Sequence, residues 1–401
     1  MTAENVSIQT RFSRKKTILF SCIAILLVWL CVEAILHAST YFGILPYIPT
    51  LTPSLYTGET VKYKLDKHGC PIFVDGYKVY QQWGIPARPV LFDSNGYRPA
   101  DAKRFGASVR KIGFFGDSYV EGLQVHDSET FPRLIEATMK QEGQNVACLN
   151  FGVGGTGTYH HYLRYLTVSE QTHLDDVVLC FLPQNDVLNN HERLGKPFGL
   201  PNAPYPVIQG GVFTDKRAEQ DTTQINRRVG LLRATIGTSF VATGIYRLVR
   251  LLAIDGRKRK ADVWKMRSSW LGVYGEPFNE DWREAWELTE AVLLRFTKAV
   301  KAKNGRLTLL IVADSLQLAD PSLLKPDIAA AYDFEYPNER LRKFCEQHGI
   351  VCLDSLPFFL EQKPTLEYPY FSWEYDGHYS KIGHQTMADF LTSTGRFEGA
   401  E

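Results

Sequence analysis

From residue 109 onward, short continuous apolar runs alternate with segments in which apolar residues recur at helical spacing. The apolar runs occupy residues 109–116, 145–152, 175–182, 306–314 and 349–356. Helical spacing marks residues 130–141, 159–170, 280–303 and 337–347. Continuous apolar strands that alternate with helices are typical of a parallel sheet with helices packed on both of its faces. The sequence therefore predicts an α/β fold built on a parallel sheet.

A second constraint lies near the N-terminus, where residues 17–38, "TILFSCIAILLVWLCVEAILHA", contain Glu33 as their only acidic residue. This run matches the roughly 20 residues that a helix needs to cross a bilayer. Four basic residues precede it, whereas the next Lys or Arg after it is Lys62. The positive-inside rule therefore places residues 1–16 in the cytoplasm as a short tail, residues 17–38 across the membrane, and the remainder outside.

A cleaved signal peptide is the alternative for the same run. The run is longer than the apolar core of a usual signal peptide, and "LHAST" matches a small-x-small cleavage site poorly. Leu30, rather than a small residue, precedes Cys31, so a lipoprotein signal does not fit either. We therefore expect an uncleaved anchor and a single-pass membrane protein whose outer domain is periplasmic or extracellular.

The rest of the chain divides into a linker and one large domain. Residues 39–100 combine a proline-rich spacer with short strands, and residues 101–401 form the sheet domain. Within it the alternation stops, so residues 191–280 are an insertion. The insertion holds a basic amphipathic segment at 227–253. This segment is either a helix pair that faces the membrane or covers substrate, or an ordinary solvated helix pair, and we favour the second interpretation.

Charge and cysteine spacing exclude several classes of protein. Lys plus Arg total 45 against 44 Asp plus Glu, so the chain lacks the excess of basic residues that proteins use to bind the phosphate backbone of nucleic acids. We therefore expect no nucleic-acid partner. The cysteines show no CxxC or zinc spacing, and the histidines show no metal-ligand spacing. We expect no metal and no other cofactor, and the sequence names no protein partner.

Polar clusters follow the first three apolar runs, at the strand ends where ligands bind in open α/β sheets. The clusters read "GDS", "GVGGTGT" and "PQND", and the chain end adds "YDGHYSKIGH". A serine nucleophile needs a base and a group that orients this base, for which Ser118, His378 and Asp376 are the candidates. Acyl transfer also needs donors around the developing oxyanion, and Gly155 and Asn185 can supply them.

With these blocks in place, the chain from about residue 90 to its end resembles the SGNH hydrolase superfamily, the GDSL-type esterases and lipases. "GDSYVEG", "NFGVGGTGT", "LPQND" and "DGHYSKIGH" match its four blocks. The resemblance implies a three-layer α/β/α sandwich with a flavodoxin-like sheet. It also implies that Ser118 attacks an ester carbonyl, that His378 accepts the proton of Ser118, and that Asp376 orients His378. The implied oxyanion hole consists of the Ser118 backbone N–H, Gly155 and Asn185.

Two positions depart from the family pattern. Pro183 replaces the glycine of the third block, and Asp376 and His378 are two residues apart, as in a shorter D-x-H variant of envelope members. Gly155 is chosen among its neighbouring glycines because it lies five residues after Asn150, as the family's oxyanion glycine does. His384 is close to the last block, but we expect it to pack or to cap a helix.

We therefore expect a membrane-anchored serine ester hydrolase that acts through an acyl-enzyme on O-acyl groups, in particular O-acetyl groups, of an envelope glycan. The candidate substrates are an acylated small molecule, a glycan or a lipid. The alternatives are an O-acyltransferase to a polysaccharide, a lipid esterase or lysophospholipase, and a non-catalytic glycan-binding assembly subunit. These assignments to the envelope rest on analogy with the family.

Overall fold

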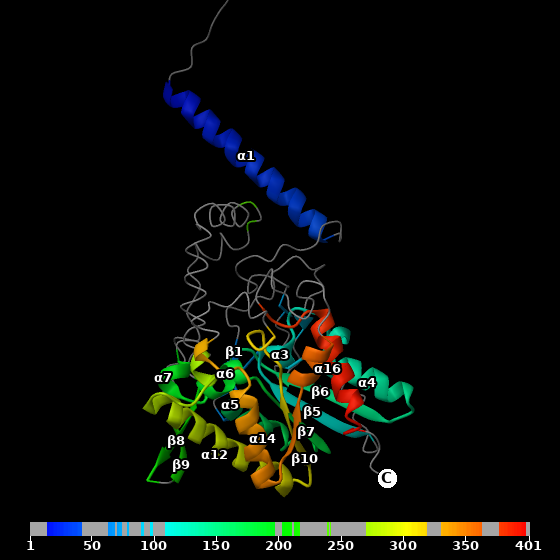
Figure 1. Cartoon of the computed structure of the whole chain (residues 1–401). Coiled ribbons are helices and arrows are strands. Elements are labelled where there is room, and N and C mark those ends of the chain that lie inside the picture. The colour runs from blue at the N-terminus through cyan, green and yellow to red at the C-terminus, as the bar shows by residue number, and fades with distance from the viewer. Residues whose placement is uncertain are drawn as a thin grey trace, which may run out of the picture.

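The computed structural model of the chain describes residues 14–41, 63–68, 70–73, 78–79, 90–91, 97–98, 109–196, 203–210, 212–216, 239, 241, 270–318, 330–362 and 377–397. Helix α1 (Arg14–Tyr41) projects from an α/β domain that contains the long strands (Figure 1). Residues 14–16 of the expected cytoplasmic tail belong to α1, whereas the rest of the tail, the proline-rich spacer and most of segment 227–253 lie outside the described residues.

The central sheet has five parallel strands: β5 (Arg110–Gly116), β6 (Val146–Gly152), β7 (Asp176–Phe181), β10 (Arg306–Ile311) and β11 (Val351–Asp354). Their spatial order is β11-β10-β7-β5-β6, with parallel pairing throughout. Read from β6 to β11 and numbered in chain order, this is 2-1-3-4-5, the flavodoxin-like order. The fold class predicted from the sequence is confirmed.

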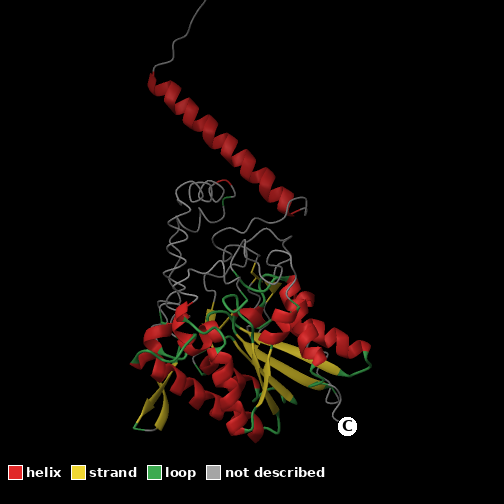
Figure 2. Ribbon diagram, in the orientation of Figure 1, coloured by secondary structure: helices red, strands yellow, loops and turns green. Residues whose placement is uncertain are grey.

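Helices cover both faces of the sheet, which makes three layers (Figure 2). One face is covered by α4 (Phe131–Gln141), α15 (Leu356–Glu361) and α16 (Lys381–Ser393). The other is covered by α5 (Thr158–Val168), α12 (Glu280–Ala302) and α14 (Tyr336–His348). The helices expected at 280–303 and 337–347 are therefore present with nearly the expected bounds.

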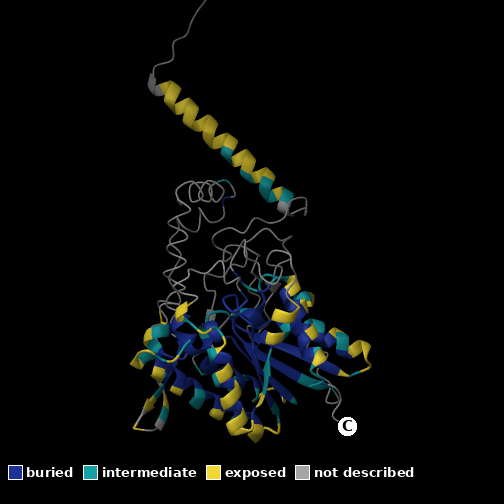
Figure 3. Ribbon diagram, viewed as in Figure 1, coloured by how far each residue is buried: buried dark blue, intermediate teal, exposed yellow. Residues whose placement is uncertain are grey.

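Neighbouring residues of the central strands belong to different cores, because successive side chains of a strand point to opposite faces. Phe114 and Val178 pack in the core beneath α4 and α16, whereas Phe115 and Leu179 pack in the core beneath α5 and α12. All four are fully buried, and the strands form the dark interior of Figure 3. A sheet buried on both faces explains why its strands read as continuous apolar runs.

Short antiparallel strands precede the domain, as expected for this part of the chain. They are β1 (Tyr63–Leu65), β2 (Pro71–Phe73), β3 (Lys78–Val79) and β4 (Val90–Leu91), paired as β1 with β2 and β3 with β4. The Asp66 carboxylate accepts a hydrogen bond from the Thr167 hydroxyl of α5 at 2.9 Å. Cys70 is buried against Tyr159 and Leu163 of the same helix. The first strand pair is thus packed onto the sheet domain.

The insertion contains helix α7 (Glu192–Gly195), an antiparallel hairpin of β8 (Tyr205–Gln209) and β9 (Val212–Lys216), and a short 3-10 turn at Leu271–Val273. The hairpin was not expected from the sequence. Its turn includes Gly210, whose φ of 57° lies in the left-handed region that glycine enters without strain.

Within α1, residues Lys16–Ser39 are long and apolar enough to cross a membrane. Most of the side chains of α1 are exposed in the structure (Figure 3). Glu33 is an exception, because its Oε1 accepts hydrogen bonds from the Ser239 hydroxyl at 2.5 Å and from the Val241 backbone N–H at 2.9 Å. A part of the insertion therefore lies against this helix.

Candidate active site

The turn from β5 into helix α3 (Ser118–Glu121) presents Ser118 as the first residue of the helix. A Cβ atom at Gly116 would lie only 2.2 Å from the Val120 side chain, so this tight turn requires glycine at that position. Asp117 caps the helix by accepting a hydrogen bond from the Tyr119 backbone N–H at 2.9 Å. Ser118 itself is half-buried. The local sequence thus holds its hydroxyl at the carboxyl end of β5.

His378 lies beside Ser118, although the two residues are 260 positions apart in the sequence. Its Nε2 atom is 2.8 Å from Oγ of Ser118, and both side chains are partly buried. An unprotonated Nε2 accepts the hydroxyl proton in this geometry. Two of the predicted catalytic residues are therefore within hydrogen-bonding distance of each other, as the activation of a serine requires.

Two tyrosines hold the short segment that carries His378. The Tyr119 hydroxyl donates to the Gly377 carbonyl at 3.1 Å, and the Tyr119 ring lies 5.3 Å from the imidazole. The Tyr379 hydroxyl donates to the Ala313 carbonyl at 2.7 Å. Gly377 has a φ of 79°, a conformation that favours glycine. Tyr119 and Tyr379 were not singled out in the sequence, although each directly follows a predicted catalytic residue.

Asp376 lies outside the described residues. Its role in orienting His378 stays a prediction.

Asn185 lies in helix α6 (Pro183–Asn189), which follows β7. Pro183 is at the start of this helix, where its fixed φ and missing N–H cost nothing. Pro183, which stands where the family pattern has glycine, therefore begins helix α6. The Asn185 amide donates from Nδ2 to Oδ2 of Asp117 at 2.8 Å, which brings Asn185 next to the nucleophile turn.

Gly155 lies in the turn after β6 and has a φ of 73°, which an L-residue with a side chain adopts only with strain. The preceding Gly154 passes close to the nucleophile, because a Cβ atom built on it would be 3.3 Å from Cβ of Ser118. Asn150 ties the end of β6 to α3: its Nδ2 donates to the Val120 carbonyl at 2.6 Å. The structure thus gathers Ser118, His378, Asn185 and the Gly154–Gly155 turn in one place.

Two buried carboxyl groups, those of Asp117 and Asp186, adjoin these residues. Burial raises the pKa of Asp117, while the Tyr119 N–H, the nearby His378 and the Asn185 amide act in the opposite direction. Burial also raises the pKa of Asp186 well above its usual range, and the neighbouring Asp117 raises it further. Asp186 accepts hydrogen bonds from the Thr158 hydroxyl and the Leu182 N–H, both at 3.3 Å. It therefore connects α6 with the start of α5, which follows the loop that carries Gly155.

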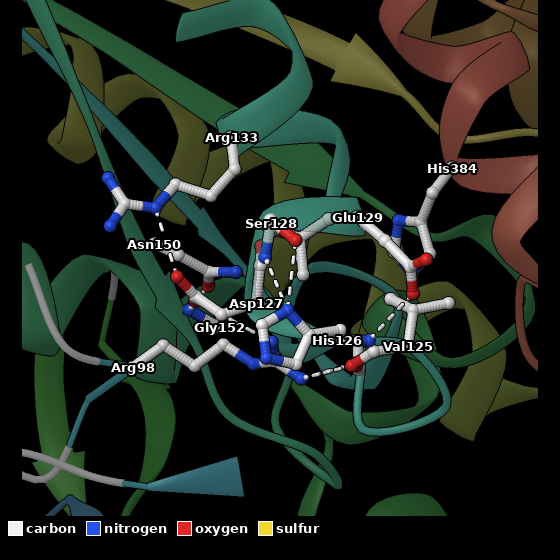
Figure 4. Close-up of polar contacts among 12 residues, drawn as sticks. Arg98, Val125, His126, Asp127, Ser128, Glu129, Arg133, Asn150, Gly152 and His384 are labelled. Carbon is white, nitrogen blue, oxygen red and sulfur yellow. Dashed lines mark hydrogen bonds and ion pairs between the residues drawn. The ribbon is translucent and has the colours of Figure 1, made fainter. Parts of the chain in front are cut away.

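Arg98 is a further buried residue that the sequence did not single out, in the segment "NGYRP". Its guanidinium is 2% exposed and donates to the Gly122 carbonyl at 2.5 Å and the Val125 carbonyl at 3.1 Å. Figure 4 shows this side chain extending toward Val125 and Asp127, and its Nη1 is 3.6 Å from Oδ1 of Asp127. Arg98 thus fixes the chain that leaves α3.

His384 lies on α16 and is 1% exposed. Its Nδ1 accepts a hydrogen bond from the Phe131 N–H at 3.4 Å, at the start of α4, and its ring stacks on Phe131. Burial, helped by the positive charge of Arg98, lowers the pKa of His384 to about 3. The imidazole is therefore neutral at ordinary pH and acts as a packing and capping group, in agreement with the expectation from the sequence.

Among the residues that the structure describes, no group of three or more His, Cys, Asp or Glu side chains is arranged to hold a metal ion. His160 and His161 on α5 are buried, and burial is the main cause that lowers the pKa of both imidazoles, that of His160 to about 3. Both side chains instead belong to the hydrogen-bonded interior around Gly157 and Thr156.

The chain is similar in structure to GDSL-type esterases, whereas no family model and no curated protein matches its sequence. One similar structure is TesA, at 12% identity and a TM-score of 0.37, over 72% of this chain and 98% of that chain. A second is a member of the lipolytic protein G-D-S-L family from Veillonella parvula, at 12% identity and a TM-score of 0.37, over 71% and 97% of the two chains. A third is the acetyl xylan esterase AlAXEase, at 15% identity and a TM-score of 0.38, over 71% and 98%.

Proposed function

We propose that this protein is a serine-dependent ester hydrolase that forms an acyl-enzyme at Ser118 and removes O-acyl groups, in particular O-acetyl groups, from a glycan of the cell envelope. The observation that carries the proposal is the 2.8 Å distance between Oγ of Ser118 and Nε2 of His378 at the carboxyl ends of the central strands. Two of the proposed oxyanion donors, Gly155 and Asn185, belong to the loop and the helix that adjoin this pair.

In the proposed first half-reaction, His378 accepts the hydroxyl proton of Ser118 at Nε2 while Oγ attacks the ester carbonyl carbon. The carbonyl oxygen becomes an oxyanion that receives hydrogen bonds from the backbone N–H groups of Ser118 and Gly155 and from the Asn185 amide. When the intermediate collapses, the bond to the alcohol oxygen breaks and His378 returns the proton to this leaving group. The products are the free sugar hydroxyl and an acyl-serine.

The second half-reaction repeats these steps with water. His378 removes a proton from the water as the water oxygen attacks the acyl carbonyl carbon. The collapse of the second intermediate breaks the bond to Oγ, and Ser118 regains its proton from His378. The carboxylic acid leaves, and the enzyme returns to its starting state. Asp376 is proposed to orient His378 and to stabilise its charged form in both halves.

Helix α1 supports the proposed location of the active site at the cell envelope. It is long and apolar enough to cross a membrane, and the excess of Lys and Arg on its N-terminal side favours a cytoplasmic N-terminus. The domain would then be periplasmic or extracellular and held near the membrane. An acylated polymer of the envelope is within reach of a site that is tethered in this way.

The test is an esterase assay on the full-length protein in detergent micelles, with p-nitrophenyl acetate as substrate. Ser118→Ala is expected to lower kcat by at least about 10⁴-fold, because the nucleophile is lost. The exposed Ser128 supplies the matched control, and Ser128→Ala should keep the wild-type rate. Release of acetate from an O-acetylated oligosaccharide, compared with longer p-nitrophenyl esters, then tests the substrate class. Equal rates for the wild type and Ser118→Ala would rule the proposal out.

A further inference from the structure

Glu121 is a buried carboxylate at the end of the nucleophile helix, and the proposed chemistry does not use it. It lies three residues after Ser118 and is 2% exposed. Its Oε2 accepts a hydrogen bond from the Gly154 backbone N–H at 3.2 Å. Acidic side chains are seldom buried without a partner or a task, because removing their charge from water is costly. The bond to Gly154 suggests what this task is.

Helix α3, which carries Ser118, is in direct contact with the end of β6 and with the glycine turn that follows it, and Glu121 lies at this contact. A Cβ atom on Gly152 would lie 2.2 Å from the Glu121 backbone nitrogen, and one on Gly154 would lie 2.8 Å from its Oε2. A larger residue at Gly152 would require a shift of the backbone, and a larger residue at Gly154 would displace the Glu121 carboxylate. The Asn150 amide adds a second tie, since Oδ1 of Asn150 accepts from the Gly152 N–H at 2.9 Å and its Nδ2 bonds to α3.

The loop needs such a tie because glycine restricts its own backbone very little. Gly154 and Gly155 are consecutive, and two residues without Cβ atoms have many accessible conformations. The Gly155 N–H belongs to the peptide that directly follows Gly154, so the direction of this N–H depends on the Gly154 dihedral angles. A fixed acceptor for the Gly154 N–H therefore restricts where the Gly155 N–H points.

We propose that Glu121 is a positioning residue for the oxyanion hole, which it sets by holding the Gly154–Gly155 turn against the nucleophile helix. This inference rests on the proposed function, because it assigns the Gly155 N–H to the oxyanion. Glu121 touches neither substrate nor the reacting atoms. It acts through the backbone of the loop.

The negative charge of Glu121 needs compensation, since a bare carboxylate near a developing oxyanion would oppose the reaction. Arg98 supplies a buried positive charge that interacts electrostatically with Glu121. Burial lowers the pKa of Arg98, and the attraction of its guanidinium to Asp127 and Glu121 counteracts this effect. Arg98 also holds the Gly122 carbonyl, directly after Glu121. The segment before the domain therefore contributes a buried residue to this part of the site.

The test compares Glu121→Ala with Glu121→Gln in the full-length protein. Glu121→Ala removes the acceptor of the Gly154 N–H, and we expect kcat for p-nitrophenyl acetate to fall about 100-fold, with KM within about twofold, because a misplaced donor affects mainly the transition state. Glu121→Gln keeps an acceptor oxygen of the same reach, and its kcat should stay within about fivefold of the wild type. The affinity for phenylboronic acid, which forms a tetrahedral adduct with serine, should fall in parallel with kcat.

Glu136 of helix α4 supplies a matched control. It is also a buried carboxylate, and its Oε2 accepts the Cys148 N–H at 2.8 Å near the start of β6, away from the site. Glu136→Ala and Glu136→Gln should lower the melting temperature but leave kcat and the boronate affinity unchanged. This comparison separates the loss of a buried carboxylate from the loss of loop positioning.

Hydrogen exchange of a peptide that spans residues 153–157 distinguishes the two proposals. Glu121→Ala should speed exchange in this peptide, and Glu136→Ala should not. An inactive wild type whose loop is nevertheless loosened by Glu121→Ala would remove the proposed function, and with it the assignment to an oxyanion hole, and would leave only the hold of Glu121 on the loop. An active wild type whose Glu121→Ala variant retains kcat and boronate affinity would overturn the positioning role, even where its stability falls.

Discussion

The side-chain amide of Asn185 donates a hydrogen bond from Nδ2 to the Oδ2 atom of Asp117 at 2.8 Å. Asp117 directly precedes Ser118, so this bond joins helix α6 to the nucleophile turn. An amide nitrogen carries two hydrogens, and the one that Asp117 does not take is available to an oxyanion. The short sequence "GDS" thus contributes the proposed nucleophile and a residue that binds one of the proposed oxyanion donors.

This relationship predicts that the effects of the two substitutions are coupled. Asn185→Ala should lower kcat for p-nitrophenyl acetate by about 10²- to 10³-fold, as the loss of an oxyanion donor does. Asp117→Ala should lower kcat less, but most of its effect should disappear when Asn185 is already alanine. A double-mutant cycle on kcat measures the coupling, with Asn145→Ala, at an exposed position, as the control. Strictly additive effects would show that Asp117 does not act through Asn185.

A second prediction concerns the dependence of stability on pH. Asp314 lies just after β10, is fully buried and accepts a hydrogen bond from the Tyr274 hydroxyl at 2.5 Å. Burial raises the pKa of Asp314 from 3.8 to about 6. The folded state therefore holds this proton more tightly than the unfolded state does. The contribution of Asp314 to stability is complete below about pH 4 and is lost as the pH rises through about 6.

Asp314→Asn should remove this dependence, because the amide does not titrate. Relative to the variant, the wild type should lose about 3 kcal/mol of unfolding free energy between pH 4 and pH 7, from the size of the pKa shift. Urea unfolding at several pH values measures the difference. Asp389→Asn, at an exposed position on α16, is the control. A constant difference between wild type and Asp314→Asn across this range would contradict the assignment.

A third prediction separates packing from catalysis at the two histidines near the chain end. His384→Ala should keep kcat within about twofold but lower the unfolding free energy by about 2–3 kcal/mol, because it opens a cavity between α16 and α4 and removes the acceptor of the Phe131 N–H. His378→Ala should have the opposite effect: kcat should fall strongly, and the unfolding free energy should change little. Parallel assays of kcat and urea unfolding test both, with the exposed His126→Ala as the control. A large loss of kcat in His384→Ala would place His384 in the reaction instead.

The strands could be predicted because they depend on local patterns, whereas the pairing of Ser118 with His378 was predicted from the need of a serine nucleophile for a base and from the resemblance to the SGNH hydrolases. Apolar runs mark buried strands, and the carboxyl ends of parallel strands meet at one edge of the sheet. Glu121, Arg98 and Tyr119 were missed for a physical reason. In sequence they read as ordinary polar or aromatic residues near a turn, and only the three-dimensional packing shows that all three are buried, Tyr119 and Glu121 in α3 and Arg98 against the segment that follows it.

The β8–β9 hairpin was missed for a different reason, since its signal was present. "YPVIQGGVF" has a Gly-Gly turn between residues of high strand propensity, which favours a hairpin. Reading the whole of 191–280 as an interruption of the α/β pattern hid this local cue. For Arg164 of helix α5, by contrast, the sequence held no signal. This side chain is fully buried and donates a hydrogen bond to the Phe151 carbonyl at 2.8 Å.

A last prediction follows from the contact of α1 with the insertion. Besides Glu33, the side chains of Trp29, Leu36 and His37 are partly covered, and these positions recur at helical spacing on one side of α1. A carboxylate in an apolar span requires partners for its oxygens, and Ser239 and Val241 supply two hydrogen bonds to Glu33. We therefore expect Ser239 and Val241 to remain against this side of α1 when the protein is in a membrane.

Cross-linking in nanodiscs tests this contact. In a Cys22→Ala, Cys31→Ala background, Glu33→Cys with Ser239→Cys should be joined efficiently by a short bismaleimide. Ile25→Cys with Ser239→Cys should be joined poorly, because Ile25 is 71% exposed and about 12 Å away along the helix. Equal yields would contradict the contact. A selective cross-link would favour the membrane-facing interpretation of segment 227–253 over the solvated one, because a segment bound to Glu33 lies beside the bilayer.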